Sequence, residues 1–522
     1  MKKNKSTWQH DLPASLVVFL VALPLCLGVG LASTNIPSIT GLPSVFSGLI
    51  AGVVGGIVVG FISKSNIGVS GPAAGLITIV LAAITTLGSF EAFLVAVVIA
   101  GILQIIAGYL KLGILANYFP SSVIKGMLAA IGITLLLKEF PHAIGYDKDF
   151  FGDESFFQAD GHNTFSELIY ALNAVHPGSI IISSVSLIIL LVLERPIFKR
   201  FSVLKFLPSA LFVVVIGVLL NLFFAQFNAR FAIQPEHLVQ IPVVKSIQDF
   251  KGLFVFPDFS FLTNPSVYII GGTIALVGSL ETLLSVEATD KLDPLKNHTP
   301  TNQELKAQGV GNIVSGLLGG LPITQVVVRS SANINSGGKS KKSTILHGVL
   351  LLISVLFLAP FINQIPLASL AAILIMVGYK LAKIQLFKQV YQQGLDQFIP
   401  FIVTIVGVLM TDLLKGIVAG IIISIFYILK RNYKNNYQII DNGEQVTILL
   451  SEEVTFLNKS GIFESLNEIK PKTKLTIDAT KSTNIDFDVL EVIQEFKAYT
   501  AVEKNIDLTL LNIPEVVVTS KH

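Results

Sequence analysis

Charged residues and cysteine are scarce in this chain of 522 residues. Aspartate, glutamate, lysine and arginine make up 14% of it, whereas a typical soluble domain carries about 25%. The single cysteine, Cys26, excludes an intrachain disulfide framework and metal sites built from clustered cysteines. The composition therefore argues against a soluble domain.

The motifs of several enzyme classes are also missing. The eight histidines include no HExxH pattern, so zinc-dependent catalysis is not indicated. The stretch GGKS (337–340) ends like a phosphate-binding loop, but Asn333 stands where that motif needs its first glycine. No basic–aromatic pattern suggests a nucleic-acid surface. We expect no enzyme, no cofactor, no resident metal and no nucleic-acid partner.

Long apolar runs take the place of the missing charge. Hydrophobic residues make up 52% of the chain, and many runs have the roughly 17–23 residues that cross a bilayer as a helix. The first seven predicted spans are Leu12–Ser33, Val45–Ile62, Gly71–Leu87, Glu91–Tyr109, Ser121–Leu137, Ser179–Leu193 and Leu207–Phe224. The second seven are Ser266–Ala288, Val310–Leu318, Val326–Asn335, Ile345–Ile362, Leu367–Gly378, Phe398–Met410 and Leu414–Leu429. We predict an α-helical polytopic membrane protein embedded in a lipid bilayer, with its transmembrane domain at residues 1–430.

The charges of the loops predict the orientation of these spans. An even number of spans places both termini on one side, and loops rich in lysine and arginine stay in the cytoplasm. The loops on the side of the termini carry Lys64, Lys111, Arg195, Lys199, Arg200, Lys205, Lys291, Lys296, Lys339, Lys341, Lys342, Lys383 and Lys388. The long loop predicted on the other side, Glu139–Pro177, instead carries Asp147, Asp149, Asp153, Glu154, Asp160 and Glu167. We therefore predict that both termini are cytoplasmic.

The two halves of this domain carry matching glycine-rich stretches. GLIAGVVGG (48–56) resembles GNIVSGLLGG (311–320), and a broken segment follows each: GVSGPAAGLITIV (68–80) and GLPITQVVVRSS (320–331). Short, interrupted segments at corresponding positions of two halves point to the binding site of a transporter. Because seven spans per half is an odd number, the repeats, about 12–225 and 265–430, must be inverted relative to each other. The alternative is a chance likeness between glycine-rich packing interfaces.

Two charged residues fall inside apolar segments. Glu281 lies about two-thirds of the way along its predicted helix, and Arg329 follows three valines. A charge in hydrocarbon costs a few kcal/mol or more, so such groups usually face a transport pathway. We interpret Glu281, with Ser285 one turn further on, as a proton acceptor or a ligand for a cation such as Na⁺. The alternatives are a structural hydrogen bond or salt bridge for Glu281 and an interfacial anchor for Arg329.

The broken segments favour an anionic substrate. If Pro72 and Pro322 begin half-helices, the free N–H groups and positive dipole ends of both point to the middle of the membrane. Two such ends would hold a small anion with little charge from side chains. Arg329, about two turns along the second half-helix, would add positive charge.

The residues after Leu429 have a different character. Strand-like runs at Val446–Leu450, Leu475–Ile477 and Ile506–Leu511 alternate with helical patterns at Gly461–Ile469 and Val489–Tyr499. Such alternation predicts a small α/β domain, cytoplasmic in this orientation, at residues 431–522.

Several stretches together resemble one known family. DLPASLVVFLVALPLCLGVGLAS (11–33), GVSGPAAG (68–75), GSLETLLSVEATD (278–290), GNIVSGLLGGLP (311–322) and VRSSANINSGGK (328–339) resemble the sulfate permease (SulP) family of inorganic anion transporters. The resemblance covers nearly the whole chain. LLSEEVTFLNKSGI (449–462) and IDLTLLNI (506–513) in the tail look like the STAS domain of that family.

The resemblance implies a 7+7 inverted repeat divided into core and gate domains, elevator-like movement and a homodimer. It places the anion between the starts of the third and tenth helices, flanked by the first and eighth. Carried onto this sequence, it selects Leu25, Ser70, Ala73, Ala74, Thr324, Gln325, Val326, Val327 and Arg329 for the anion, and Glu281 and Ser285 for the coupling cation.

The resemblance also implies a substrate. LPASLVVFLVALPLCLG (12–28) and FFGDESFFQADGHNTFSE (150–167) are similar to a bacterial subgroup linked to carbonic anhydrase. That implies bicarbonate transport across a bacterial inner membrane, with sulfate or a dicarboxylate as the alternative substrate. Relatives that take bicarbonate with Na⁺ often have aspartate in place of Glu281 and a hydroxyl residue in place of Ala73, so the glutamate favours H⁺ coupling. A passive anion channel and a nucleobase–cation symporter are further alternatives; Glu281 argues against the first, and Arg329 with the STAS-like tail against the second.

Overall fold

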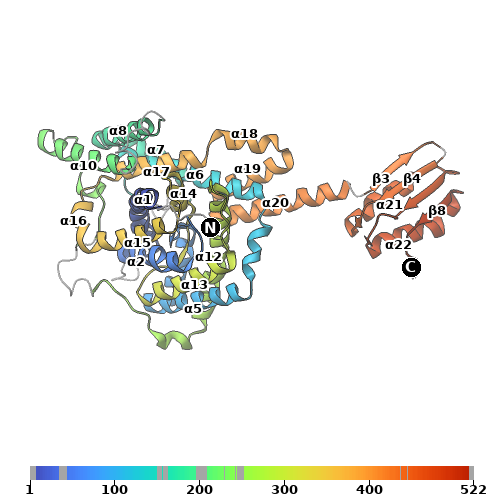
Figure 1. Cartoon of the computed structure of the whole chain (residues 1–522), viewed down its shortest axis with the longest axis horizontal. Helices are drawn as coiled ribbons and strands as arrows, with labels where there is room; N and C mark the ends of the chain where they lie inside the picture. Colours follow the sequence, from blue (N-terminus) through green and yellow to red (C-terminus); the bar gives the residue numbers. More distant parts are fainter. Residues whose placement is uncertain are drawn as a thin grey trace. The chain divides into compact units, whose positions relative to one another are not determined.

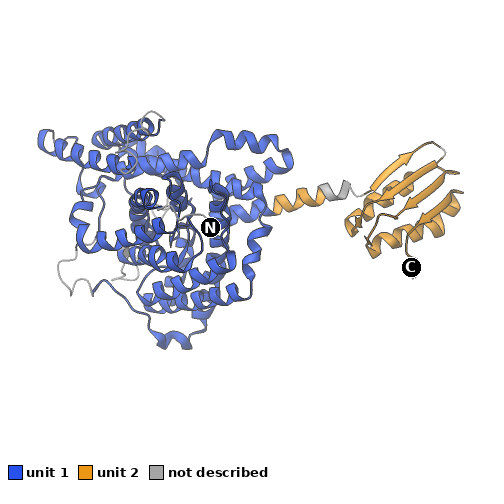
Figure 2. Ribbon diagram, in the orientation of Figure 1, with its two compact units in different colours: residues 1–421 blue, residues 422–522 orange. Residues whose placement is uncertain are grey.

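The computed structural model describes residues 7–34, 44–149, 156, 163–195, 208–228, 230–241, 243, 252–434, 437–443 and 445–515. The chain divides into two compact units, residues 1–421 and 422–522 (Figure 2). The first unit consists almost wholly of helices, and the second contains a β-sheet with helices (Figure 1). Of the charged residues used to predict orientation, Lys199, Arg200, Lys205, Asp153, Glu154 and Asp160 lie outside the described residues, as does most of the segment 150–167.

The first half contains the helices predicted from the apolar runs and two further ones, at Leu112–Tyr118 and Thr164–Asn173. They are α1 (Trp8–Thr34), α2 (Ser44–Val54) with the π-helical turn η1 (Gly55–Val59) and α3 (Gly60–Ile62), η2 (Ala74–Leu76) with α4 (Ile77–Leu87), α5 (Phe90–Tyr109), η3 (Leu112–Tyr118), α6 (Ser121–Ile144), α7 (Thr164–Asn173), α8 (Pro177–Leu193) and α10 (Ser209–Phe227). The 3₁₀ turns η5 (Pro235–His237) and η6 (Phe259–Thr263) follow.

The second half repeats this succession of long and short helices. It contains α12 (Pro265–Leu292), α13 (Thr301–Leu317), α14 (Val327–Asn335), α15 (Lys342–Ile353) with η7 (Ser354–Leu358) and α16 (Ala359–Ile362), α17 (Leu367–Leu381), α18 (Ile384–Gln392), α19 (Leu395–Met410) and α20 (Leu413–Lys434). In the described parts of the chain, seven helices are long and apolar enough to cross a membrane, nine if two bent pairs each count as one span, and three more apolar helices are shorter.

Two predicted boundaries are wrong. The span expected at Val310–Leu318 belongs to α13, which already begins at Thr301, because its polar first half is packed inside the protein. The segment Glu139–Pro177, expected to be a loop, contains the end of α6 and the helix α7. The predicted span ends at Leu137, but α6 continues to Ile144. Lys138, the first residue beyond the predicted span, is buried with Asp149 and Glu167 each at 3.7 Å from its Nζ.

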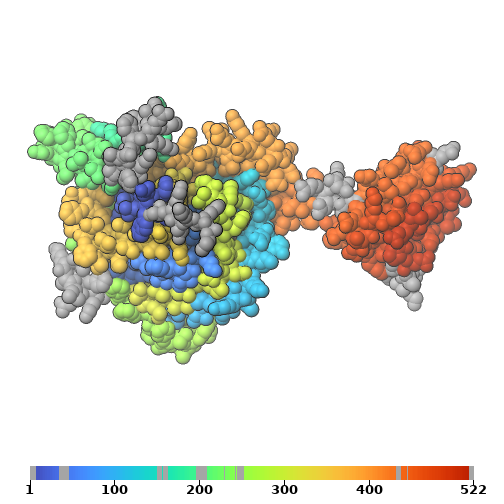
Figure 3. All heavy atoms as spheres, in the orientation of Figure 1, coloured from blue at the N-terminus to red at the C-terminus, as the bar shows by residue number. Residues whose placement is uncertain are grey.

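Helix α1 is buried along most of its length and packs against α2, α14 and α15. Figure 3 shows the residues of α1, in dark blue, beside yellow-orange segments from the region of α15. Helices α5 and α13 approach closely through glycine: a Cβ on Gly101 would lie 2.5 Å from the carbonyl oxygen of Gly309. Small residues of this kind let membrane helices pack backbone against backbone.

The second unit is a four-stranded sheet covered by helices. Its strands are β3 (Tyr437–Asp441), β4 (Gln445–Leu450), β6 (Lys474–Asp478) and β8 (Asp507–Leu511), in the order β3-β4-β6-β8, with only β3 antiparallel to its neighbour. The pair β5 (Glu453–Val454) and β7 (Asn484–Ile485), the turns η8 (Phe456–Asn458) and η9 (Phe496–Thr500), and the helices α21 (Lys459–Glu468), α22 (Phe487–Glu495) and α23 (Ala501–Glu503) complete it. The three predicted strands and both helical patterns are thereby confirmed.

Candidate functional site

The two broken segments meet in the middle of the first unit. Strand β1 (Ser70–Pro72) pairs antiparallel with β2 (Ile323–Gln325), with Ser70 opposite Gln325. The turn η2 and helix α4 follow β1, and α14 follows β2. Asn312 of α13 fixes β2, since its Oδ1 accepts from the Ile323 N–H at 2.6 Å and its Nδ2 donates to the Ile323 carbonyl at 3.1 Å. Both short helices therefore begin next to the strand pair β1–β2, which is called the strand crossing below.

The prediction that Pro72 and Pro322 open the half-helices is wrong. Pro72 ends β1, and Pro322 stands just before β2. The residues that follow stay extended to form the crossing, as the backbone of Val326 (φ −113°, ψ 123°) shows. The helices therefore start later than the prolines suggest, and Arg329 lies in the first turn of α14 rather than two turns along it.

Arg329 is almost completely buried, with 1% of its surface exposed. Its Nη2 donates to the Pro72 carbonyl at 3.4 Å, and the guanidinium lies against Gly71, where a Cβ would be 1.9 Å from Nη1. Cys26 of α1 also lies close to it. Its Nε and Nη1 have no hydrogen-bond partner within the described residues. This burial argues against the interfacial anchor, which needs a side chain that reaches the membrane surface.

Glu281 lies opposite, on α12, and is partly buried. Its carboxylate packs against Gly75, where a Cβ would be 3.1 Å from Oε1. Helix α12 is tied to β2 by Gln325, whose N–H lies 3.4 Å from Thr282 Oγ1 and whose Nε2 lies 3.5 Å from the Ser285 carbonyl. The Arg329 guanidinium thus packs against Gly71 and the Glu281 carboxylate against Gly75. These two glycines lie four residues apart in the first broken segment.

A cavity of about 30 Å³ lies between these groups. It is lined by Leu25, Val29, Pro72, Ala74, Gly75, Ile131, Glu281, Ser285, Val326, Val327, Val328, Arg329 and Leu413. Seven of the predicted site residues are in this set: Leu25, Ala74, Glu281, Ser285, Val326, Val327 and Arg329.

The other four predicted residues, Ser70, Ala73, Thr324 and Gln325, do not line the cavity. Ser70, Thr324 and Gln325 belong to the crossing strands themselves, and Ala73 directly follows β1.

Sequence reasoning did not single out Gly75, Ile131 or Leu413. Gly75 is the last residue of GVSGPAAG (68–75), and a glycine in a broken segment is the feature that could have identified it. Ile131 and Leu413 come from α6 and α20, which no local pattern connects to the broken segments.

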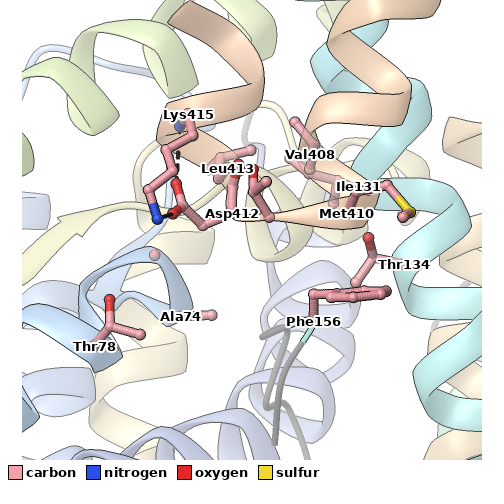
Figure 4. Close-up of a pocket in the computed structure, with 12 residues that line it drawn as sticks. Ala74, Thr78, Ile131, Thr134, Phe156, Val408, Met410, Asp412, Leu413 and Lys415 are labelled. Carbon is pink, nitrogen blue, oxygen red and sulfur yellow. Dashed lines mark hydrogen bonds and ion pairs between the residues drawn. The ribbon is translucent and has the colours of Figure 1, made fainter. Parts of the chain in front are cut away.

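A wider cavity of about 280 Å³ adjoins the first and shares Ala74, Gly75, Ile131 and Leu413 with it. Figure 4 shows Thr78 and Thr134 near this space and Asp412 beside Lys415; Oδ2 and Nζ of that pair are 2.8 Å apart. The wider cavity therefore places hydroxyl groups and this ion pair next to the smaller one, within a mainly apolar lining.

Within the described residues, no group of three or more His, Cys, Asp or Glu side chains is placed to hold a metal ion. A helical membrane bundle with two helix starts and a buried guanidinium around one cavity defines a membrane transport protein for a small anion.

Comparison with known proteins gives the family. The profile of the Sulfate permease family matches residues 8–406, and the chain belongs to that family. It is 27% identical to a candidate sulfate transporter of Bacillus subtilis (strain 168), YvdB, over 82% of this chain and 75% of that protein. It is also 27% identical to the bicarbonate transporter BicA of Picosynechococcus sp. (strain ATCC 27264 / PCC 7002 / PR-6), over 73% of this chain and 63%, less than two-thirds, of BicA.

Solved structures show the same fold. The transmembrane domain of a cyanobacterium bicarbonate transporter BicA matches with a TM-score of 0.55 and 22% identity, over 80% of this chain and 98% of that one. The inward-facing murine Slc26a9 anion transporter matches with a TM-score of 0.66 and 15% identity, over 99% and 87%. The predicted family and fold class are confirmed, and the protein is an anion transporter rather than an enzyme.

Proposed function

We propose that this protein is a secondary active transporter of a small inorganic anion, with bicarbonate as the first candidate substrate and sulfate as the second. The observation that carries the proposal is the position of Arg329. Its guanidinium is buried where two helix starts meet, with Nε and Nη1 free to donate within the described residues. Helix N-termini and guanidinium groups both attract anions. The BicA relative supports bicarbonate, and YvdB supports sulfate.

Glu281 and Ser285 are the proposed coupling groups. They line the same cavity as Arg329, so a proton on Glu281, or a Na⁺ ion held with Ser285, would change the charge felt by the anion. Binding of the two ions would then be linked, which is what a symporter requires. A passive channel has no need of a titratable group at this place.

Alternating access by elevator-like movement fits the construction of the cavity. One group of lining residues comes from the strand crossing and the helices around it, namely α1, α12, α14 and the β1–α4 segment. A second group comes from α6 and α20. Movement of the first group against the second would carry the anion across. In the full proposal, residues 1–430 form the transporter and 431–522 a STAS-like domain. The protein would form a homodimer in a bacterial inner membrane, with cytoplasmic termini and a functional link to carbonic anhydrase.

Uptake of labelled bicarbonate and sulfate into proteoliposomes tests this function. Uphill bicarbonate uptake driven by an imposed H⁺ or Na⁺ gradient is the expected result. Uphill uptake of sulfate alone would keep the site and change the substrate. Downhill movement only, under either gradient, would contradict coupled transport and indicate a channel.

The variant Glu281→Gln tests the coupling group. The amide keeps the size of the side chain but neither takes up a proton nor attracts Na⁺ as a carboxylate does. We expect the variant to bind and exchange the anion while its uphill accumulation falls by at least about tenfold, a loss of about 1.4 kcal/mol of coupling. Accumulation equal to that of the wild type would show that Glu281 is structural.

A further inference from the structure

A second buried carboxyl group lies near the strand crossing but outside the cavity. Glu304, in the first turn of α13, has 1% of its surface exposed. Its Oε2 accepts from the Ser63 hydroxyl at 2.5 Å, and its Oε1 accepts from Gln308 Nε2 at 2.8 Å. Both donors are neutral, and within the described residues no lysine, arginine or histidine forms an ion pair with this carboxyl group.

Within the described residues, the charged groups near Glu304 make no direct contact with its carboxyl group. Asp290, at the end of α12, acts on it with a charge of the same sign. The Nζ of Lys341 donates to the carbonyls of Phe61 (2.9 Å) and Ser63 (3.5 Å). An ionised carboxylate buried without a cation is costly, whereas a protonated carboxyl is not. The surroundings of Glu304 therefore favour a group that carries a proton.

Hydrogen bonds connect Glu304 to the candidate site. The Gln308 Nε2 that bonds to Glu304 also donates to Ser70 Oγ at 2.7 Å. Ser70 pairs with Gln325 in the crossing, and Gln325 Nε2 lies 3.5 Å from the carbonyl of Ser285. Side-chain hydrogen bonds thus lead from Glu304 through Gln308 to Ser70. The backbone pairing of Ser70 with Gln325 then joins them to the helix turn that carries Glu281 and Ser285.

Polar groups also lead from Glu304 in the opposite direction. The N–H of Ser65 donates to Ser63 Oγ at 3.0 Å, and Ser65 Oγ lies 3.2 Å from the Thr299 hydroxyl. That hydroxyl lies 2.8 Å from Asp290 Oδ1. Asp290 is partly exposed, near the lysines that predict the cytoplasmic side. The hydroxyl groups of Ser65 and Thr299 can each donate and accept, whereas the Ser65 N–H that joins them to Ser63 only donates.

Two acceptors along this route lack a donor. Gln308 Oε1 and Gln325 Oε1 have no hydrogen-bond partner in the described part of the chain, and both residues are 0% exposed. A buried acceptor without a donor is destabilising. A water molecule entering between these groups would supply the missing donors.

We propose that Glu304 is a second proton-binding residue of the transport cycle, whose protonation is linked through these hydrogen bonds and the strand pair to the coupling residues beside the anion. The inference rests on the proposed function, because it assumes coupling to protons. Glu304 does not line the cavity, so its removal should change coupling and leave anion binding intact.

The variant Glu304→Gln tests this role, since the amide keeps the size and one acceptor oxygen but has no titrating proton. Asp293→Asn is the matched control: Asp293 is 2% exposed at the same end of the unit and bonds to the N–H groups of Leu295 and Asn297. Two rates are measured in proteoliposomes: self-exchange of labelled anion without a gradient, and uphill uptake under a pH gradient. Glu304→Gln should keep the exchange rate and its KM but lose at least about tenfold in uphill uptake, while Asp293→Asn keeps both.

Each outcome separates the inference from the proposed function. Normal uphill uptake by Glu304→Gln, or loss of exchange together with uptake, would show a structural role and overturn the inference alone. Wild-type accumulation driven by Na⁺ but not by H⁺ would also overturn it and leave coupled transport in place. If the wild type accumulates neither anion under either gradient, the proposed function itself fails. Should Glu304→Gln not fold, Gln308→Leu, which breaks the link to Ser70, must show the same selective loss of uphill uptake; otherwise the inference is overturned.

Discussion

In the proposed site, Arg329 is the residue on which anion binding should depend most directly. Replacing it with alanine removes the charge and the free N–H groups beside the cavity. We expect Arg329→Ala to raise the KM for the anion by at least about tenfold, equivalent to about 1.4 kcal/mol of binding. The concentration dependence of uptake measures this. Lys339→Ala, at an exposed lysine of the following loop, is the control with unchanged KM. An unaltered KM in Arg329→Ala would exclude the guanidinium from the binding site.

Gly71 makes room for that guanidinium. A Cβ at this position would lie 1.9 Å from Nη1, a distance that no side chain tolerates without movement. Overpacking of a buried site costs about 1–3 kcal/mol. We therefore expect Gly71→Ala to lower the thermal unfolding midpoint and to raise the KM as Arg329→Ala does.

Gly272→Ala is the matched control, because nothing lies within 4 Å of its added Cβ. A Gly71→Ala protein with the stability and KM of that control would mean that the guanidinium does not occupy this place in the membrane.

At the scale of elements, the sequence predicts the helices well and their meeting point poorly. Apolar length and glycine-rich repeats locate α1, α5 and α12 and both broken segments. The pairing of Ser70 with Gln325 joins residues 255 positions apart, and no local pattern encodes it. The start of α14, and with it the position of Arg329, depends on that pairing.

The choice of cavity-lining residues could not be predicted for a related reason. Ala73 and Ala74 are adjacent alanines, yet only Ala74 lines the cavity, because the chain changes from extended to 3₁₀ geometry between them. Charge, in contrast, is visible in sequence: Glu281 and Arg329 are conspicuous because a membrane segment excludes charges that lack a role.

The segment after α6 joins three elements through a histidine–carboxylate cluster. Asp147 Oδ1 is 2.5 Å from His142 Nδ1 of α6, and Oδ2 is 2.5 Å from His237 Nδ1 of η5. The ring of His176, which caps α8, is 5.8 Å from that of His237, and Glu236 Oε1 is 3.6 Å from His237 Nε2. The hydrogen bond to Asp147 raises the pKa of His237. Burial opposes ionisation of Asp147, but the bonds to both histidines outweigh it and lower its pKa.

These shifts predict how stability depends on pH. A histidine whose pKa is raised by folding stabilises the protein below its unfolded pKa of about 6.5, and the contribution is lost as pH rises through the raised folded value. The contribution of Asp147 is present above its unfolded pKa of about 3.9 and is lost as pH falls through the lowered folded value. We therefore expect the unfolding midpoint of the wild type to fall as pH rises above about 6.5.

His237→Gln should flatten that part of the profile. Thermal unfolding of purified protein between about pH 5 and about pH 9 measures the effect. His10→Gln, at an exposed histidine of α1, should keep the wild-type slope. An equal slope in His237→Gln would show that the contact with Asp147 contributes nothing to stability.

At the scale of the whole molecule, each unit has a hydrophobic core of its own. One cluster of buried residues extends from Val17 to Ile417, and another, from Val446 to Ile506, lies within the second unit. Every residue that lines the two cavities belongs to residues 1–421. Stability of the second unit and anion binding by the first should therefore respond to different substitutions.

Ile477→Ala tests this independence. Ile477 is 0% exposed in β6, between β4 and β8, and loss of its side chain should cost about 2–5 kcal/mol. That is a large part of the roughly 5–15 kcal/mol that stabilises a domain. Hydrogen exchange followed by mass spectrometry should show faster exchange in residues 437–515 and unchanged exchange in the first unit, with the KM for the anion unaltered. Ile440→Ala, at a residue 45% exposed on the edge strand β3, should leave both units as in the wild type. A raised KM in Ile477→Ala but not in Ile440→Ala would instead show that the folded second unit takes part in anion binding.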